Sequence, residues 1–285
     1  MKISVIIPAK DEAKALADLL PSLEALGDKY EIILVDDGSV DGTADLCRQF
    51  NKIKTVHHAY PKGNGAAIKS GVRSASGDVL VFMDADGQHN PEDIKKLVDK
   101  IEEGYDMVVG SRSLKAHANI FYNIFATWIT SHRIQDLTSG LRAIRTKVLR
   151  QFLYLLPNGF SYPTTITMAM YRSGYSICYI PVDVSERQGN SHINPFTDGL
   201  RFILIIFKVG VLYAPLKIFA LTSLLFFISG LGYYFYTFTT QSRFTNMSML
   251  LFISSIIILL IGMISEQLTV LLYSSSKEEY DKNES

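Results

Sequence analysis

Two aspartates that follow a strongly apolar run are the residues whose types and spacing most clearly point to chemistry. Residues 79–83 are apolar throughout, and Asp84 and Asp86 come directly after them, separated by one alanine. The run has the length and β-branched content of a strand buried on both faces, and Gly87 ends it. Carboxylates at the end of a buried strand cost desolvation energy unless positive charge offsets them. The pattern therefore predicts a divalent cation held by carboxylates, water and substrate phosphates.

Acidic residues also follow other predicted strands. Apolar runs alternate with amphipathic stretches over residues 1–110, which predicts a mostly parallel, doubly wound α/β sheet. The expected strands are Ile3–Ile7, Glu31–Val35, Ile53–Val56, Val79–Met83 and Met107–Val109, and the expected helices are Ala13–Leu26, Thr43–Phe50, Ala66–Ser74 and Pro91–Glu103. Glu12 and the pair Asp36–Asp37 fall at strand ends, where such sheets bind ligands. Helix capping explains any one of these carboxylates, but together they predict a site.

Two apolar segments near the end of the chain decide the broad class. Residues 218–240 and 244–265 carry no charged side chain, and only residues 241–243 link them. A helix of roughly 20 apolar residues spans a bilayer. We therefore expect a helical hairpin that crosses a membrane twice, with two buried helices of a soluble domain as the less favoured alternative.

Basic residues set the expected orientation of this hairpin. Lys208 and Lys217 precede it and Lys277 follows it, whereas Arg243 stands alone in the link. The positive-inside rule then places the catalytic domain and both termini in the cytoplasm. We expect a catalytic domain over residues 1–190, an interfacial helix over 191–216, two transmembrane helices over 217–273 and a polar tail over 274–285. Apolar faces in segments 119–130 and 196–213 predict helices in the headgroup plane, or helices packed on the sheet.

The composition excludes some partners. Among 285 residues, 28 are basic and 28 acidic, so the formal net charge is zero and no nucleic acid partner is indicated. Cys47 and Cys178 lack the spacing of metal ligands and fit a reducing compartment.

Several short segments, in this order along the chain, resemble the family 2 glycosyltransferases. They are VIIPAKDE at 5–12, VDDGSVDGT at 35–43, GNGAAIKSG at 63–71, MDADGQHNPEDI at 83–94, VVGSR at 108–112, QDLTSGLRAIR at 135–145 and ERQGNSH at 186–192. With the hairpin that follows them, they are most similar to the dolichol-phosphate mannose synthase branch. The resemblance implies a GT-A-type fold, followed by interfacial amphipathic helices and the transmembrane hairpin.

The resemblance also implies an activity and its residues. The expected reaction is the inverting transfer of a sugar from a nucleotide sugar (GDP-mannose or a UDP-hexose) to a polyprenyl phosphate (dolichyl or undecaprenyl phosphate). The implied nucleotide-binding residues are Pro8, Ala9, Glu12, Asp37, Gly63, Gly65, Asp84 and Ala85, and the implied ligands of Mg²⁺ or Mn²⁺ are Asp84, Asp86 and Gln88. The candidates for the acceptor phosphate are Arg112, Arg142, Arg187 and His192, and the candidate catalytic residues are Asp86, Asp136 and Arg112.

The chain departs from these relatives at two positions. Relatives often carry an acidic residue where residues 161–165 of this chain have none, and commonly a lysine where His192 stands. The missing acidic residue is compatible with a phosphate acceptor. Because the second pKa of a phosphate is about 6, such an acceptor is already largely dianionic at pH 7 and needs no strong general base. Asp136 is then the remaining candidate carboxylate. Arg142 has the alternative role of stabilising its own loop, and Arg187 that of pairing with Glu186.

Two other classes of function stay open at this point. The Asp84–Gly87 sequence also resembles the nucleophile motif of haloacid-dehalogenase-type phosphoryl-transfer enzymes, although those usually place it near the start of the fold. A non-catalytic membrane adaptor that kept the fold is the other alternative. Relatives include monomers and tetramers, so a homo-oligomer is also possible.

Overall fold

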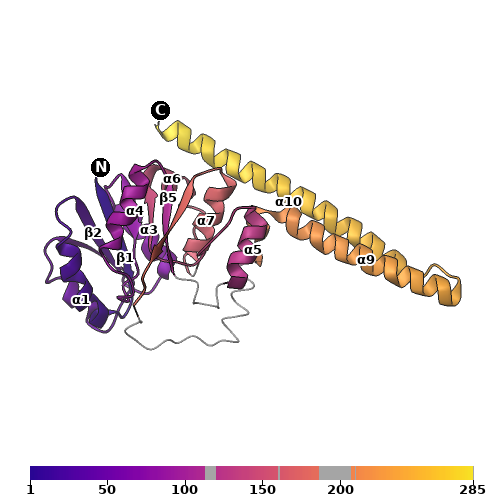
Figure 1. Cartoon of the computed structure of the whole chain (residues 1–285), viewed down its shortest axis with the longest axis horizontal. Helices are drawn as coiled ribbons and strands as arrows, with labels where there is room; N and C mark the ends of the chain where they lie inside the picture. The colour runs from indigo at the N-terminus through magenta and orange to yellow at the C-terminus, as the bar shows by residue number, and fades with distance from the viewer. Residues whose placement is uncertain (113–119, 160, 186–206, 209, 285) are drawn as a thin grey trace. The chain divides into compact units, whose positions relative to one another are not determined.

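A computed structural model of the chain describes residues 1–112, 120–159, 161–185, 207–208 and 210–284 (Figure 1). The chain forms two compact units, Met1–Asp198 and Gly199–Ser285. The first contains the sheet and every described candidate site residue, and the second contains the two long apolar helices. The predicted interfacial segment 191–216 lies mostly outside the described residues.

A mixed seven-stranded sheet forms the centre of the first unit. Its strands are β1 (Ile3–Ala9), β2 (Tyr30–Asp36), β3 (Ile53–His57), β4 (Val79–Phe82), β5 (Met107–Arg112), β6 (Arg142–Arg145) and β7 (Ile177–Val182), in the order β3-β2-β1-β4-β6-β5-β7. β6 is antiparallel to both of its neighbours, and all other pairs are parallel. The predicted α/β class and the expected strands are confirmed. The sequence interpretation did not identify β6 or β7.

Helices cover both faces of this sheet. The described helices of the unit are α1 (Ala13–Glu24), α2 (Thr43–Cys47), α3 (Asn64–Ser74), α4 (Asp93–Glu102), α5 (Ile120–Thr130), α6 (Thr146–Phe152) and α7 (Tyr162–Arg172). The apolar residues of α1 and α4 pack in one cluster with the alternate residues Ile3, Val5 and Ile7 of β1. Ile6 points to the opposite face, where α3 approaches it closely at Gly71. The predicted helix at Pro91 begins instead at Asp93, because residues 90–92 form a turn closed by the Asn90 side chain.

β4 is buried on both faces, as its sequence predicts. Residues 79–83 have no exposed surface. Val79 and Val81 join the cluster with α1 and α4, while the ring of Phe82 packs edge-on against Tyr162 of α7 at 5.8 Å between centroids. The strand therefore holds the residues that follow it, including Asp84, in a rigid layer.

The register of β6 determines what lies next to the end of β4. Arg142, the first residue of β6, pairs with both Phe82 of β4 and Val109 of β5. The N–H of Gly110 then donates to the carbonyl of Leu141 at 2.9 Å. Because β6 runs antiparallel, residues 136–141 lie beside the carboxyl ends of β4 and β5.

The second unit is a helical hairpin of α9 (Pro215–Gln241) and α10 (Asn246–Glu284), which run side by side (Figure 1). By length and composition, Pro215–Gln241 and Asn246–Leu271 are each able to span a membrane. The Ser223 hydroxyl donates to the Ser255 carbonyl at 2.8 Å, and a Glu266 carboxylate oxygen accepts the Leu216 N–H at 3.3 Å. The predicted pair of long apolar helices is confirmed.

The first turn of α3 is held by a loop distant in sequence. The N–H groups of Gly65 and Ala66 donate to the carbonyls of Gly159 at 3.3 Å and Asn158 at 2.8 Å. A Cβ atom at Gly65 would overlap the Pro157 carbonyl oxygen, whereas one at Gly159 would meet open space. Gly65 is thus required by packing between backbones.

Gly65→Ala is expected to lower the melting temperature of the detergent-solubilised chain by about 5 °C, because the loop has to move away from α3. Gly159→Ala is the matched control and should leave the melting temperature nearly unchanged. The melting temperatures are measured by circular dichroism. Equal decreases in the two variants would contradict this account of Gly65.

Candidate active site

A pocket of about 400 Å³ lies at the carboxyl ends of β1, β2 and β4. Its volume is in the range of small-molecule binding sites. The lining residues are Pro8, Ala9, Lys10, Glu12, Asp37, Pro61, Gly63, Asn64, Ala67, Asp84, Ala85 and Asp86. The predicted nucleotide-binding residues therefore meet in one place, except Gly65, which is not among the lining residues.

The loops after β1 and β2 are locked together at one wall of this pocket. The Asp11 carboxylate accepts the Val40 N–H at 2.8 Å, and the Asp11 N–H donates to the Ser39 hydroxyl at 3.0 Å. Asp41 accepts the Ala13 N–H at 2.9 Å. Asp11 has a φ of +56°, which is uncommon for a residue with a side chain. These contacts tie the loop after β1 to the loop after β2 beside the pocket.

Asp37 is a buried carboxylate whose negative charge is stabilised by hydrogen-bond donors of the protein. It accepts hydrogen bonds from His58 Nδ1 at 2.7 Å and from the N–H groups of Lys62 and Gly63, each at 2.8 Å. Burial alone would raise the pKa of Asp37, but these donors hold it below its ordinary value. Nε2 of the buried His58 lies 2.8 Å from the Ser70 hydroxyl. Asp37 therefore fixes the segment that forms the opposite wall.

Asp84, in contrast, has too little positive charge around it to offset its burial. Burial raises the pKa of Asp84 above its ordinary value; His89 opposes this shift and Asp86 adds to it. Gln88 donates its N–H to Asp86 at 3.1 Å and its side-chain amide to the Ser185 carbonyl at 3.3 Å. The Asp84 carboxylate, with the Asp86 carboxylate two residues further on, offers hard oxygen ligands of the kind that Mg²⁺ and Mn²⁺ prefer.

The protein supplies only part of a coordination shell there. The described part of the chain contains no group of three or more His, Cys, Asp or Glu side chains placed to hold a metal ion. A cation on Asp84 and Asp86 would need oxygens from water, from an amide such as Gln88 or from a substrate phosphate to complete its shell.

Gly140 lies directly against the Asp84 carboxylate. A Cβ atom at residue 140 would overlap the Asp84 carboxylate oxygens. This contact follows from the β6 register, since residue 140 enters β6 where Asp84 leaves β4. A glycine is therefore needed to leave room for the carboxylate.

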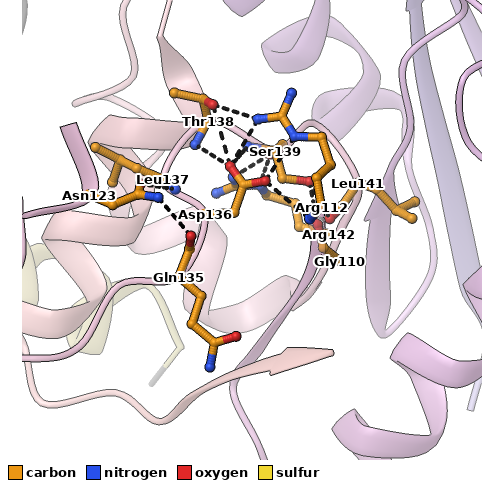
Figure 2. A network of polar contacts seen from close by, with 10 residues as sticks. All are labelled: Gly110, Arg112, Asn123, Gln135, Asp136, Leu137, Thr138, Ser139, Leu141 and Arg142. Carbon is orange, nitrogen blue, oxygen red and sulfur yellow. Dashed lines mark hydrogen bonds and ion pairs between the residues drawn. The ribbon is translucent and has the colours of Figure 1, made fainter. Parts of the chain in front are cut away.

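Arg112 and Asp136 form a two-bond ion pair at the end of β5 (Figure 2). Arg112 donates from Nε to one Asp136 oxygen at 2.8 Å and from Nη2 to the other at 2.9 Å. Asp136 also accepts the backbone N–H groups of Arg112, Thr138 and Ser139. Burial alone would raise the pKa of Asp136, but the Arg112 guanidinium and these N–H groups hold it below its ordinary value.

This pair has one side that a ligand can reach. The Arg112 side chain is 29% exposed, and its Nη1 makes no hydrogen bond to any described residue. Arg112 also interacts electrostatically with Asp84 and Asp86. Asp136, expected to be a catalytic residue, accepts both ion-pair bonds from Arg112 and thereby fixes the orientation of its guanidinium group.

Among the other acceptor-phosphate candidates, Arg142 alone lies within the described residues, and it is not at this exposed side. Arg142 has no exposed surface and donates to the Ser139 carbonyl, the Pro163 carbonyl and the Thr167 hydroxyl. Burial lowers the pKa of Arg142 from its ordinary value. The contacts support the alternative that Arg142 stabilises its own loop. Arg187 and His192 lie outside the described residues.

Sequence reasoning missed some residues that shape the site. Gly140 lies inside the quoted 135–145 segment, so the motif contained it without revealing its role. His58 and Asn123 belong to no recognised motif, and nothing in the sequence indicated that they hold carboxylate-bearing segments.

Asp136→Asn is expected to lower the stability of the chain at pH 7, because Arg112 loses its charged partner. The native-state pKa of Asp136 lies below the unfolded value of about 3.9, so its contribution is present above that pH and lost as the pH falls further. The difference in urea midpoint between wild type and variant should therefore shrink below about pH 4. A difference that grows on acidification would contradict the assignment.

Comparisons with known proteins give the family. Residues 4–154, more than half of the chain, match glycosyl transferase family 2, and residues 214–271 match the GtrB C-terminal hairpin. The chain is 28% identical over 216 residues to a dolichyl-phosphate hexose transferase of Haloferax volcanii, covering 73% of this chain and 93% of that protein. It is 42% identical over 178 residues to a dolichol-phosphate mannosyltransferase of Pyrococcus furiosus, covering 56% of this chain but only 50% of that protein.

Solved structures give the same fold. Glucosyl-3-phosphoglycerate synthase of Mycobacterium tuberculosis, crystallised with Mn²⁺, UDP and glucosyl-3-phosphoglycerate, superposes with a TM-score of 0.59 at 21% identity, over 70% of this chain and 75% of that one. The expected GT-A-type fold is confirmed by this likeness. With more than half of its length matched and the acidic strand ends gathered in one pocket, the chain belongs to glycosyl transferase family 2.

Proposed function

We propose that this chain is a polyprenyl-phosphate glycosyltransferase. It would transfer a sugar from a nucleotide sugar, GDP-mannose or a UDP-hexose, to dolichyl or undecaprenyl phosphate. The observation that carries the proposal is the meeting of two unlike charges at one rim: the partly buried Asp84 carboxylate in the pocket beside Asp86, and the partly exposed Arg112 guanidinium, which interacts electrostatically with both aspartates. The names of the relatives, a hexose and a mannose transferase acting on dolichyl phosphate, agree with it.

The pocket is proposed to bind the donor. Pro8, Ala9 and Gly63 would form its walls around the nucleoside, and Glu12 would accept hydrogen bonds from hydroxyl or ring N–H groups. Asp84 and Asp86, with Gln88 beside them, would hold Mg²⁺ or Mn²⁺ against the diphosphate. The bound cation would stabilise the negative charge that develops on the departing nucleoside diphosphate.

Arg112 is proposed to bind the acceptor phosphate. Its Nη1 edge offers N–H donors in a fixed plane, which suits a phosphate, and Asp136 holds that plane in position. An acceptor phosphate oxygen attacks the anomeric carbon while the bond to the diphosphate breaks, which inverts the configuration. A phosphate that is largely dianionic at pH 7 needs no strong general base, consistent with the absence of an acid among residues 161–165.

The hairpin is proposed to keep the enzyme at its lipid substrate. If the two helices span the membrane, the basic residues Lys208, Lys217 and Lys277 near their ends would favour a cytoplasmic position of the catalytic unit by the positive-inside rule. Ile124 and Trp128 of α5 are 63% and 41% exposed, as expected for a helix whose apolar face meets the headgroup region. Membership in a glycosyltransferase family removes the support for the phosphoryl-transfer alternative.

The proposal is tested by incubating membranes that contain the protein with radiolabelled nucleotide sugars, one at a time, plus polyprenyl phosphate and Mg²⁺ or Mn²⁺. One donor should give lipid-extractable label that is lost with a chelator and reduced at least about 100-fold in Asp86→Ala. Asp28→Ala, an exposed acidic position remote from the pocket, is the control and should keep wild-type activity. If no donor labels lipid, or if Asp86→Ala retains cellular function, the adaptor alternative is the better account.

Gly140→Ala should impair the same reaction through Asp84, because the added methyl group displaces the carboxylate. We expect at least a tenfold loss of transfer and a higher concentration of Mn²⁺ for half-maximal rate, about 1.4 kcal/mol or more of lost binding. Gly159→Ala serves as the control at an open glycine. A Gly140→Ala enzyme with an unchanged Mn²⁺ requirement would show that Asp84 does not hold the cation.

A further inference from the structure

We infer that Asn123 of α5 is a positioning residue for Arg112, acting through residues 135–139. This inference rests on the proposed function only where it calls Arg112 the acceptor-phosphate ligand. The mechanical part, that Asn123 sets the arrangement of Arg112, stands on the contacts alone.

The side chain of Asn123 holds the backbone on both sides of Asp136. Its side-chain oxygen accepts the Leu137 N–H at 3.0 Å, and its side-chain nitrogen donates to the Gln135 carbonyl at 2.7 Å (Figure 2). An amide matches this pair of backbone groups, since it carries an NH₂ donor group and a carbonyl acceptor. Asp136 lies between the two anchored residues, so its backbone is fixed from both neighbours.

Asp136 passes this constraint to Arg112. Besides the two ion-pair bonds, it accepts the backbone N–H of Arg112 at 3.2 Å and those of Thr138 and Ser139 at 3.1 Å each. The Ser139 hydroxyl donates to the Gly110 carbonyl at 2.6 Å, which ties the far end of the segment to β5. The orientation of the Arg112 guanidinium therefore depends on the position of residues 135–139, and Asn123 holds that segment in place.

The connection gives α5 an influence on the acceptor site. Ala126 and Ile129 are buried, and Thr127 accepts the Ile134 N–H at 3.1 Å, so the helix is seated on the catalytic unit. From α5, Asn123 reaches both neighbours of Asp136. A shift of α5 along its own axis would move residues 135–137 and rotate the guanidinium of Arg112.

The test compares Asn123→Ala with Thr130→Ala in the full chain in detergent. Thr130 is on the same helix, and its hydroxyl bonds to the Ala126 carbonyl and to His132 rather than to residues 135–139. Amide hydrogen exchange, which needs no substrate, is measured at residues 112 and 137–139. Steady-state kinetics then give KM for polyprenyl phosphate and for the nucleotide sugar separately.

Asn123→Ala should speed exchange at Arg112, Thr138 and Ser139 as well as at Leu137, and raise KM for the lipid about tenfold with an unchanged KM for the donor. In an Arg112→Lys background, which cannot form the two-bond pair, the same change should add little. Faster exchange confined to Leu137, or an equal effect of Thr130→Ala, would overturn the inference. Propagated exchange without any sugar transfer by wild type would support the positioning role and refute the proposed function.

Discussion

The site depends on one topological constraint: an antiparallel strand inserted between parallel strands. β6 pairs with β4 and β5 at the same residue, Arg142, and therefore carries the segment before it to the end of both strands. That segment places Gly140 against the Asp84 carboxylate and Asp136 against Arg112. In a sheet of parallel strands alone, the residues beside the carboxyl ends of β4 and β5 would belong to loops that lead from a strand into a crossover helix. The proposed donor side and the proposed acceptor side are thus connected by a few residues of backbone.

The carboxylates of this rim divide by how far the protein compensates their charge. Asp37 and Asp136 accept several hydrogen bonds each, and both have a lowered pKa. Asp84 has a raised pKa, because burial and Asp86 outweigh the positive groups nearby. Compensated carboxylates organise the backbone, whereas an uncompensated one favours binding of an added cation. Burial and hydrogen bonding therefore separate structural acids from ligand-binding acids that look alike in sequence.

The sequence was sufficient to predict the elements with strong periodicity and the residues that follow them. Residues 79–83 identified a doubly buried strand and, with it, the position of Asp84 and Asp86. β6 escaped because its short run contains two arginines, and its pairing depends on contacts distant in sequence. The sequence could not distinguish a phosphate-binding role of Arg142 from a structural one, because the burial and contacts that support the structural role depend on the tertiary fold. The contacts of Asn123 and His58 are likewise set by packing between segments that no local pattern relates.

The division of the rim into a donor side and an acceptor side is tested most directly by Arg112→Ala. The account predicts that KM for polyprenyl phosphate rises at least about tenfold in steady-state assays, because the planar donor edge is lost. Binding of the nucleoside diphosphate with Mn²⁺, measured by calorimetry on the same variant, should stay unchanged. An unchanged KM for the lipid, or loss of nucleotide binding, would contradict it.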